Sequence, residues 1–157
     1  MISEENKNLL FNASIFSGLT TAQLSSVLDT AVEVSFLKGD VIMTEGEEAG
    51  ELFVVIEGRI QIEKRHGEDS TIKIAQSEQR GMMLGEMSLV DMKPRSATVR
   101  ADSDLKMVRF SRESLADIFD KDPKVLATIS LNIARTLSDR LRHSNDVLTE
   151  FFSNLTA

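Results

Sequence analysis

The sequence predicts an α+β fold in which an antiparallel β jelly roll is flanked by N-terminal helices and a long C-terminal helix. Three observations lead to this prediction. Between residues 32 and 110, apolar and polar residues alternate in short runs, as in half-buried strands. Turn signals rich in glycine and acidic residues separate these runs at intervals of about 8–12 residues. Helical patterns, with apolar residues three and four positions apart, occupy both ends of the chain.

The length of the chain favours a single domain. It has 157 residues, which is long enough to bury a sizeable core. We expect one domain over 1–157, with N-terminal helices in 1–31, the jelly roll in 32–110 and C-terminal helices in 111–157. A hydrophobic fraction of 41% and a charged fraction of 27% are typical of a soluble globular protein.

Composition and charge exclude several classes of protein. The chain has no Cys, which excludes disulfides, thiolate chemistry and Cys-based zinc sites. No apolar run approaches the roughly 20 residues that cross a bilayer, and the polar, acidic N-terminus differs from a secretory signal. We therefore expect a cytoplasmic protein with no membrane partner. A net charge of −7 argues against a nucleic-acid partner.

The N-terminal helices carry local start signals. Residues 4–13 contain Leu9 and Leu10 in a short helical pattern. Thr20 and Gln23 form a predicted capping box, with Thr20 as the N-cap. The helix that follows is expected to end near Thr30 and to place three apolar residues on one face: Leu24, Val27 and Leu28.

The central region is expected to form a series of short strands. They cover residues 32–36, 41–43, 52–56, 59–64, the region around Ile72 and Ile74, 97–101 and 105–110. We expect turns at residues 38–40 and 66–69. Glu57 and Gly58 are the expected two-residue turn of a β-hairpin.

The C-terminal part should form two helices. Ser111 is the predicted N-cap of a helix reaching about residue 120, and Asp122-Pro123 should begin the last one. That helix could run for about 30 residues, or about 45 Å, which is longer than one jelly roll requires. We expect the surplus to bury its apolar face elsewhere. Its apolar stripe comprises Leu126, Ile129, Ile133, Leu137, Leu141, Leu148, Phe151 and Leu155.

The segment from Gly85 to Val99 is the predicted binding site. A short helical turn at 87–89 would leave backbone N–H groups available to an anion, and Gly85 would allow a ligand close to the backbone. Arg95 follows Pro94 and could fork onto phosphate oxygens.

Two further side chains extend the predicted ligand beyond a phosphate. Ser96 would add a hydroxyl group beside the phosphate. The Glu86 carboxylate would repel a phosphate but suits a hydroxyl donor such as a ribose 2′-OH. These groups indicate a ligand with both a phosphate and a free ribose hydroxyl. The alternative is that Glu86 and Arg95 merely pair on a surface loop.

This segment resembles the phosphate-binding cassette of the cyclic-nucleotide-binding domain family. The family includes the ligand domains of catabolite activator protein and of kinase regulatory subunits. The matching positions are Gly85, Glu86, Met87, Ser88 and Leu89, then Arg95, Ser96, Ala97, Thr98 and Val99. The resemblance implies cyclic AMP or cyclic GMP as the ligand, held by the cassette and lidded by the last helix. The ligand contacts that it implies are Gly85, Glu86, Met87, Ser88, Arg95, Ser96, Ala97 and Arg140.

Purine choice and Arg140 are left open by the sequence. A hydroxyl at the position of Ser96 reads the guanine in some cyclic-GMP-selective relatives, but the same Ser occurs in cyclic-AMP binders, so Ser96 does not decide between them. No second guanine-reading group is visible, and we therefore favour cyclic AMP over cyclic GMP. Arg140 has two interpretations. It could stack on the purine, as an Arg does in some relatives, or it could be a solvated helix residue paired with Asp139 or Asp146.

Residues for enzyme chemistry are scarce. A metal-binding cupin enzyme, also a jelly roll, needs several His ligands, and the chain has only His66 and His143, in different predicted elements. The same scarcity leaves no Ser-His-Asp triad to assign. We therefore expect no enzyme and no metal. The segment after the long helix is too short for a helix-turn-helix, so we expect no DNA-binding domain.

These observations predict a stand-alone cyclic nucleotide sensor with a regulatory role in signalling. Ligand binding would shift how the C-terminal helix docks, and this helix is also the expected surface of a homodimer. The effector protein is unknown. Two alternatives remain: an interaction or dimerisation protein with an empty pocket, and a regulator that acts through a separate effector chain.

Overall fold

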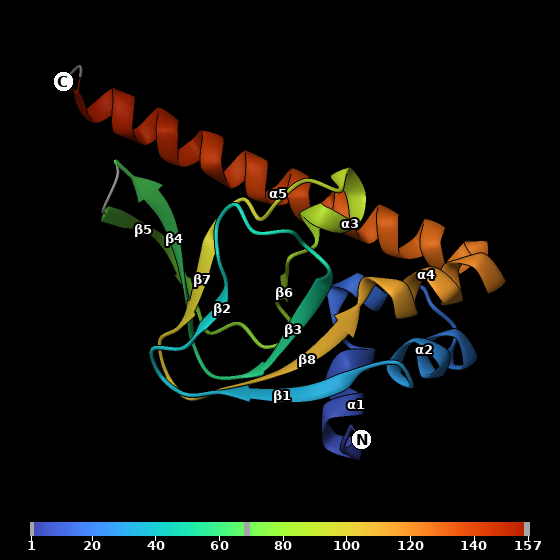
Figure 1. The fold of residues 1–157 in the computed structure, drawn as a ribbon. Helices are drawn as coiled ribbons and strands as arrows, with labels where there is room; N and C mark the ends of the chain where they lie inside the picture. Colours follow the sequence, from blue (N-terminus) through green and yellow to red (C-terminus); the bar gives the residue numbers. More distant parts are fainter. Residues whose placement is uncertain (1, 68–69, 156–157) are drawn as a thin grey trace.

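The computed structural model describes residues 2–67 and 70–155, and it confirms the predicted fold class: a jelly roll of two antiparallel sheets with helices packed at one end and a long C-terminal helix (Figure 1). One four-stranded sheet has the order β1-β8-β3-β6, and the other has the order β2-β7-β4-β5. The strands are β1 (Val32–Phe36), β2 (Val41–Met43), β3 (Glu51–Glu57), β4 (Ile60–His66), β5 (Ser70–Ser77), β6 (Met83–Leu84), β7 (Thr98–Ala101) and β8 (Leu105–Ser111). The helices are α1 (Glu4–Phe11), the 3₁₀ turn η1 (Ser14–Phe16), α2 (Thr21–Leu28), α3 (Met87–Asp91), α4 (Arg112–Lys121) and α5 (Pro123–Leu155).

The predicted helix starts are confirmed. The Thr20 hydroxyl accepts a hydrogen bond from the backbone N–H of Gln23 at 3.3 Å, and the Gln23 side chain accepts one from the Thr20 N–H at 3.0 Å. The Ser111 hydroxyl caps α4 by accepting from the Ser114 N–H at 3.1 Å. These local pairings satisfy N–H groups that a helix start would otherwise leave unbonded.

The expected hairpin at Glu57-Gly58 is wrong. β3 pairs with β8 and β6, whereas β4 pairs with β5 and β7, so the chain crosses from one sheet to the other here. Gly58 has φ +101°, and a Cβ on it would lie 2.4 Å from the backbone oxygen of Asp104. This glycine is therefore required by close packing at a crossover. The turn predicted for 66–69 lies partly outside the described residues.

The core has two parts that share β3. Leu52, Val54 and Ile56 pack against the helices, while Phe53 and Val55 face the interior between the two sheets. Both faces of β3 are therefore buried, which explains its continuous apolar run.

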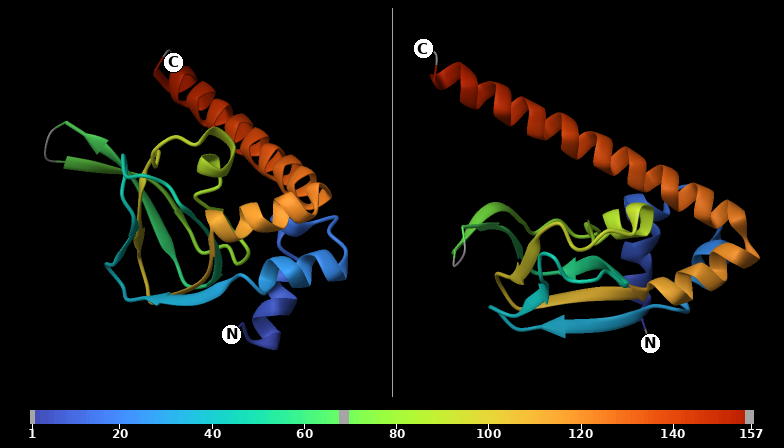
Figure 2. Two further views of the ribbon diagram at one scale, coloured as in Figure 1. Left: turned by 45° about the vertical axis from the view of Figure 1, so that its right-hand side comes forward. Right: turned by 45° about the horizontal axis from the view of Figure 1, so that its top comes forward.

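Helix α5 is anchored only through its first half. Val125, Ile129 and Ile133 are buried against the core, whereas Leu126, which was predicted to belong to the apolar stripe, is 43% exposed. Val125 takes the buried position that was predicted for Leu126, a difference of one residue or 100° around the helix axis. Val125 lies four residues before Ile129, which lies four residues before Ile133, so these three side chains share one face of the helix. Every described residue after Arg140 is exposed, and α5 runs past the sheets to a distant C-terminal end (Figure 2). Among the described residues, no helix combines the length and apolarity needed to cross a bilayer.

Candidate functional site

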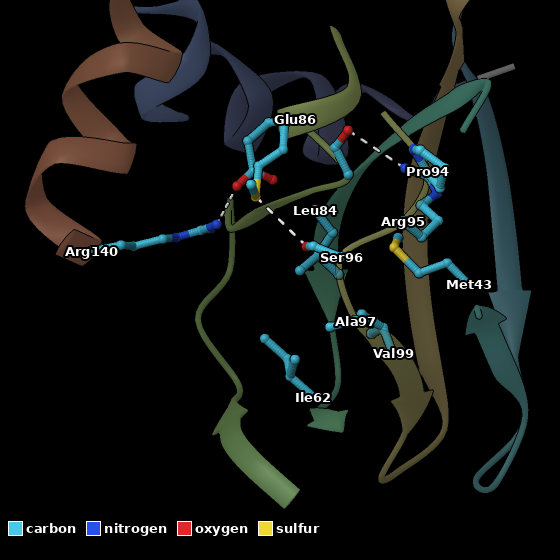
Figure 3. A pocket seen from close by; sticks show the side chains of 12 residues that line it. Met43, Ile62, Leu84, Glu86, Pro94, Arg95, Ser96, Ala97, Val99 and Arg140 are labelled. Carbon is cyan, nitrogen blue, oxygen red and sulfur yellow. Dashed lines mark hydrogen bonds and ion pairs between the residues drawn. The ribbon is translucent and has the colours of Figure 1, made fainter. Parts of the chain in front are cut away.

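The structure brings seven of the eight predicted site residues together around one cavity. The cavity has a volume of about 90 Å³ and lies between the 85–97 segment, the inner faces of the sheets and α5 (Figure 3). The seven are Gly85, Glu86, Met87, Arg95, Ser96, Ala97 and Arg140. The eighth, Ser88, lies in α3, and its side chain is outside the described part of the structure.

Arg95 is a buried cation held by backbone carbonyls. Its exposed fraction is 8%, and its Nη2 donates to the carbonyl oxygen of Glu51 at 2.8 Å, while Nη1 lies 3.5 Å from that of Gly85. Burial lowers the pKa of Arg95, and the carboxylates of Glu51, Glu47 and Glu86 act in the opposite direction. Since an arginine stays protonated in proteins, the result is a fixed positive charge in a partly desolvated position.

Gly85 makes this placement of Arg95 feasible. Its φ is +81°, a conformation that favours glycine. A Cβ here would lie 2.4 Å from Nη1 of Arg95 and 2.9 Å from the carbonyl oxygen of Glu51. The absence of a side chain therefore leaves room for the guanidinium itself, in addition to any ligand.

Glu86 is the second buried charge of the site. It is 3% exposed and lies at the N-cap of α3, the short helix predicted for 87–89. Its Oε1 forms an ion pair with Nη1 of Arg140 (Figure 3). Since Glu86 and Arg95 are both buried, the surface-loop alternative for this pair is wrong.

Arg140 does not form the ion pair with a neighbouring Asp that was expected if it were a solvated helix residue. Its partners are Glu86 and the carbonyl oxygen of Met83, which accepts from Nη2 at 3.0 Å, and not Asp139 or Asp146. Sequence reasoning considered only neighbours on the same helix, whereas Glu86 lies 54 positions away. The stacking role of Arg140 stays a prediction.

Ser96 and Met87 form the rim of the cavity. Both are exposed, and the Ser96 hydroxyl lies 3.7 Å from the Met87 sulfur. The Ser96 carbonyl accepts a hydrogen bond from Nζ of Lys64 at 2.7 Å, and Lys64 also pairs with Glu45 at 2.6 Å. Sequence reasoning did not predict this contact between β4 and the rim, because Lys64 is indistinguishable in sequence from any other polar strand residue.

The cavity wall is mostly apolar. Sequence reasoning did not assign these residues to the site, although strand alternation places such side chains on the inner faces of the sheets. They are Met43, Ile62, Leu84 and Val99.

The chemistry available is two arginine cations, one of which is paired with the single carboxylate, and one hydroxyl against an apolar wall. This set suits a small ligand with an anionic group, a hydroxyl and an apolar ring. No group of three or more potential metal ligands occurs among the residues that the structure covers. Fold and site together define a jelly-roll domain with a cavity lined by buried side chains of opposite charge.

Comparisons with known proteins identify the family. Residues 33–122 match the cyclic nucleotide-binding domain family. The chain is 26% identical over 144 residues to a CRP-like cAMP-activated global transcriptional regulator of Mycobacterium tuberculosis, covering 90% of this chain and 61% of the regulator. It is 31% identical over 111 residues to a cGMP-dependent protein kinase of Eimeria tenella, covering 71% of this chain and 10% of the kinase.

Solved structures agree on the fold. A cyclic nucleotide-binding domain from Methylobacillus flagellatus aligns with a TM-score of 0.80 at 22% identity, covering 93% of this chain and 82% of that one. Because the family match spans more than half of the residues, the chain belongs to the cyclic nucleotide-binding domain family. It spans 61% of the regulator and a tenth of the kinase, so the activities of those whole proteins are not transferred to it.

Proposed function

We propose that this chain is a regulatory module that binds a cyclic nucleotide in the cavity between Arg95 and Glu86. The observation that carries the proposal is that these two buried side chains, of opposite charge and nine positions apart, line the same cavity. Arg95 would bind the cyclic phosphate through charge-assisted hydrogen bonds. Glu86 would accept the ribose 2′-hydroxyl, and the apolar wall would contact the sugar and the purine.

Cyclic AMP is the ligand that we favour. The relatives do not decide between cyclic AMP and cyclic GMP, because the name of the regulator refers to cAMP and that of the kinase to cGMP. Among the described lining residues, Ser96 is the only hydroxyl-bearing side chain. A guanine offers an additional amine donor and carbonyl acceptor, and a mostly apolar wall leaves such groups unpaired.

Calorimetric titration with cyclic AMP and cyclic GMP tests the proposal. Arg95→Ala should weaken binding by roughly 2–5 kcal/mol, or about 30-fold to several thousand-fold, since the phosphate loses its partner in a partly desolvated cavity. Arg95→Lys should recover little of this, because the planar fork is lost. Arg59→Ala is the matched control: it removes one positive charge whose carboxylate partner, Asp102, lies outside the cavity lining, and it should bind like wild type. Equal affinity of wild type and Arg95→Ala would refute the assignment.

The role of Glu86 has a separate test. A 2′-deoxy cyclic nucleotide should bind more weakly than its ribo parent, and Glu86→Gln should narrow that difference. If the deoxy analogue binds as tightly as the parent in wild type, Glu86 does not read the ribose.

The exposed part of α5 supports a second function, formation of a homodimer. Large apolar side chains remain exposed after Arg140, and surfaces of this kind commonly mark interaction sites. They are Leu141, Val147, Leu148, Phe151, Phe152 and Leu155. Light scattering of wild type and Leu148→Glu tests this function. A dimer that Leu148→Glu disrupts would support it, and a dimer that gives no heat with either nucleotide would favour the empty-pocket alternative.

A further inference from the structure

The apolar inner face of strand β4 is interrupted by a lysine beside the cavity. Ile60 is buried between the sheets, and Ile62 lines the cavity. Since every second side chain of a strand lies on the same face, the next inward position belongs to Lys64, whose side chain is 45% exposed. A lysine in such a place needs polar partners for its ammonium group, and these partners indicate what it does.

Two partners hold the Lys64 ammonium group at the rim of the cavity. Its Nζ donates to the Glu45 carboxylate at 2.6 Å and to the carbonyl oxygen of Ser96 at 2.7 Å. Glu45 is itself fixed, because its carboxylate accepts from the backbone N–H of Arg65 at 2.8 Å and its own N–H donates to the Thr98 hydroxyl at 3.0 Å. The hydrogen bonds from Lys64 and from the Arg65 N–H lower the pKa of Glu45, so its carboxylate stays ionised near neutral pH.

The carbonyl group that Lys64 holds belongs to the peptide between Ser96 and Ala97, and both of these residues line the cavity (Figure 3). The C=O and N–H of a planar trans peptide point in opposite directions. A Ser96 carbonyl held toward β4 therefore turns the N–H of Ala97 away from β4. A cation on the carbonyl oxygen also polarises the peptide group, which makes its N–H a stronger hydrogen-bond donor.

We propose that Lys64 is a positioning residue of the ligand site: it fixes the peptide between Ser96 and Ala97 so that the Ala97 N–H donates to the anionic group of the ligand. Glu45 is the counterion that keeps the ammonium group on the carbonyl oxygen. Lys64 itself does not touch the ligand. This inference rests on the proposed function, and it adds to that site a residue on β4 that acts through the backbone of the 85–97 segment.

Calorimetric titration of Lys64→Met with cyclic AMP is the first test. Binding should weaken by about 5- to 30-fold, because a donor to a charged group is misplaced. Lys64→Arg, which keeps a cationic donor, should recover most of the affinity. Arg65→Met is the matched control and should bind like wild type. It removes the same charge from the next residue of β4, whose bond to the Glu45 carboxylate uses the backbone and whose side chain makes only a 3.4 Å contact with the Glu45 carbonyl oxygen.

The ratio of the affinities for cyclic AMP and cyclic GMP separates positioning from direct recognition of the purine. Both nucleotides carry the same cyclic phosphate, so Lys64→Met should weaken the binding of both by the same factor. A variant that changes the ratio would show that Lys64 contacts the purine, and the positioning role would be overturned. Wild-type affinity of Lys64→Met for cyclic AMP would overturn it as well.

A second measurement needs no nucleotide. In proton–nitrogen correlation spectra, the amide signal of Ala97 responds to the hydrogen bond on the preceding carbonyl group. In the unliganded protein this signal should shift in Lys64→Met and stay close to its wild-type position in Lys64→Arg and Arg65→Met. If wild type binds neither nucleotide, the proposed function fails, and the Ala97 signal still decides whether Lys64 orients the peptide. The same signal in wild type and Lys64→Met would refute that orientation.

Discussion

Replacement of Gly85 by Ala is the prediction with the clearest structural basis. The new Cβ would lie 2.4 Å from Nη1 of Arg95 and 2.9 Å from the carbonyl oxygen of Glu51. The first contact is relieved by moving the Arg95 guanidinium, which ends a flexible side chain, whereas the second requires a shift of the backbone. The variant should therefore lose affinity for cyclic AMP although Arg95 itself is retained.

The magnitude has two parts. A non-glycine residue at positive φ costs about 1–2 kcal/mol, and overpacking adds about 1–3 kcal/mol. Gly39→Ala is the matched control, because Gly39 has φ +98° but a Cβ added to it would meet no atom within 4 Å. At about 2–4 °C per kcal/mol for a chain of this length, Gly85→Ala should melt about 2–12 °C below Gly39→Ala.

Calorimetric titration well below the melting temperature completes the test. We expect Gly85→Ala to bind cyclic AMP at least about tenfold more weakly than wild type, a loss of about 1.4 kcal/mol, and Gly39→Ala to bind like wild type. If the two glycine variants bind equally well, the position of Arg95 beside Gly85 does not determine binding, and the reasoning is refuted.

Three further predictions concern stability and selectivity. Cyclic AMP at about 100 times its Kd should add roughly 2.7 kcal/mol of stability and raise the melting midpoint by about 5–11 °C; no shift in a thermal denaturation scan would contradict ligand binding. Ser96→Ala should weaken the binding of cyclic AMP by no more than about tenfold, as expected for the loss of one neutral hydrogen bond. If wild type prefers cyclic GMP, a competition assay should show that the variant has lost this preference. Burial acts to raise the pKa of Glu63, but hydrogen bonds from Arg100 and Gln61 outweigh it, so the pKa lies below the ordinary 4.5. A carboxylate whose pKa is lowered in the folded state stabilises the fold at pH values above its unfolded-state pKa. This contribution to the free energy of unfolding is lost as the pH falls from that value through the lower, folded-state pKa. The stability difference between wild type and Arg100→Ala, measured by urea unfolding, should therefore shrink as the pH falls through about 4.5. Lys106→Ala, whose pair with Glu57 is exposed on both sides, should show no such trend.

Local signals in the sequence were enough to predict most of the elements, although not the two-residue strand β6, and together with the resemblance to the family they indicated seven of the residues that line the cavity. The Thr20 and Ser111 caps satisfy N–H groups within three residues, so their effect is visible in sequence. The positions of Gly85, Glu86 and Arg95 likewise depend on one short segment. Gly58 shows the limit: strand alternation predicted β3 and β4 correctly, but not that each finds its partners in a different sheet.

The contacts that were missed join distant parts of the chain. Arg95 is oriented by the backbone oxygen of Glu51, and a backbone carbonyl carries no signature in the amino-acid sequence. Arg140 pairs with Glu86 across 54 positions, and that pairing depends on how α5 packs on the core through Val125, Ile129 and Ile133. The predicted stripe had this register right at Ile129 and Ile133 but not at Leu126. The register controls which side chain of α5 reaches the site.

A crystal structure of the protein with cyclic AMP tests the central claim most directly. The account predicts the phosphate oxygens within about 2.7–2.9 Å of the Arg95 guanidinium nitrogens and the ribose 2′-hydroxyl on the Glu86 carboxylate. A phosphate bound away from Arg95, or a nucleotide outside the cavity formed by the 85–97 segment, would contradict it.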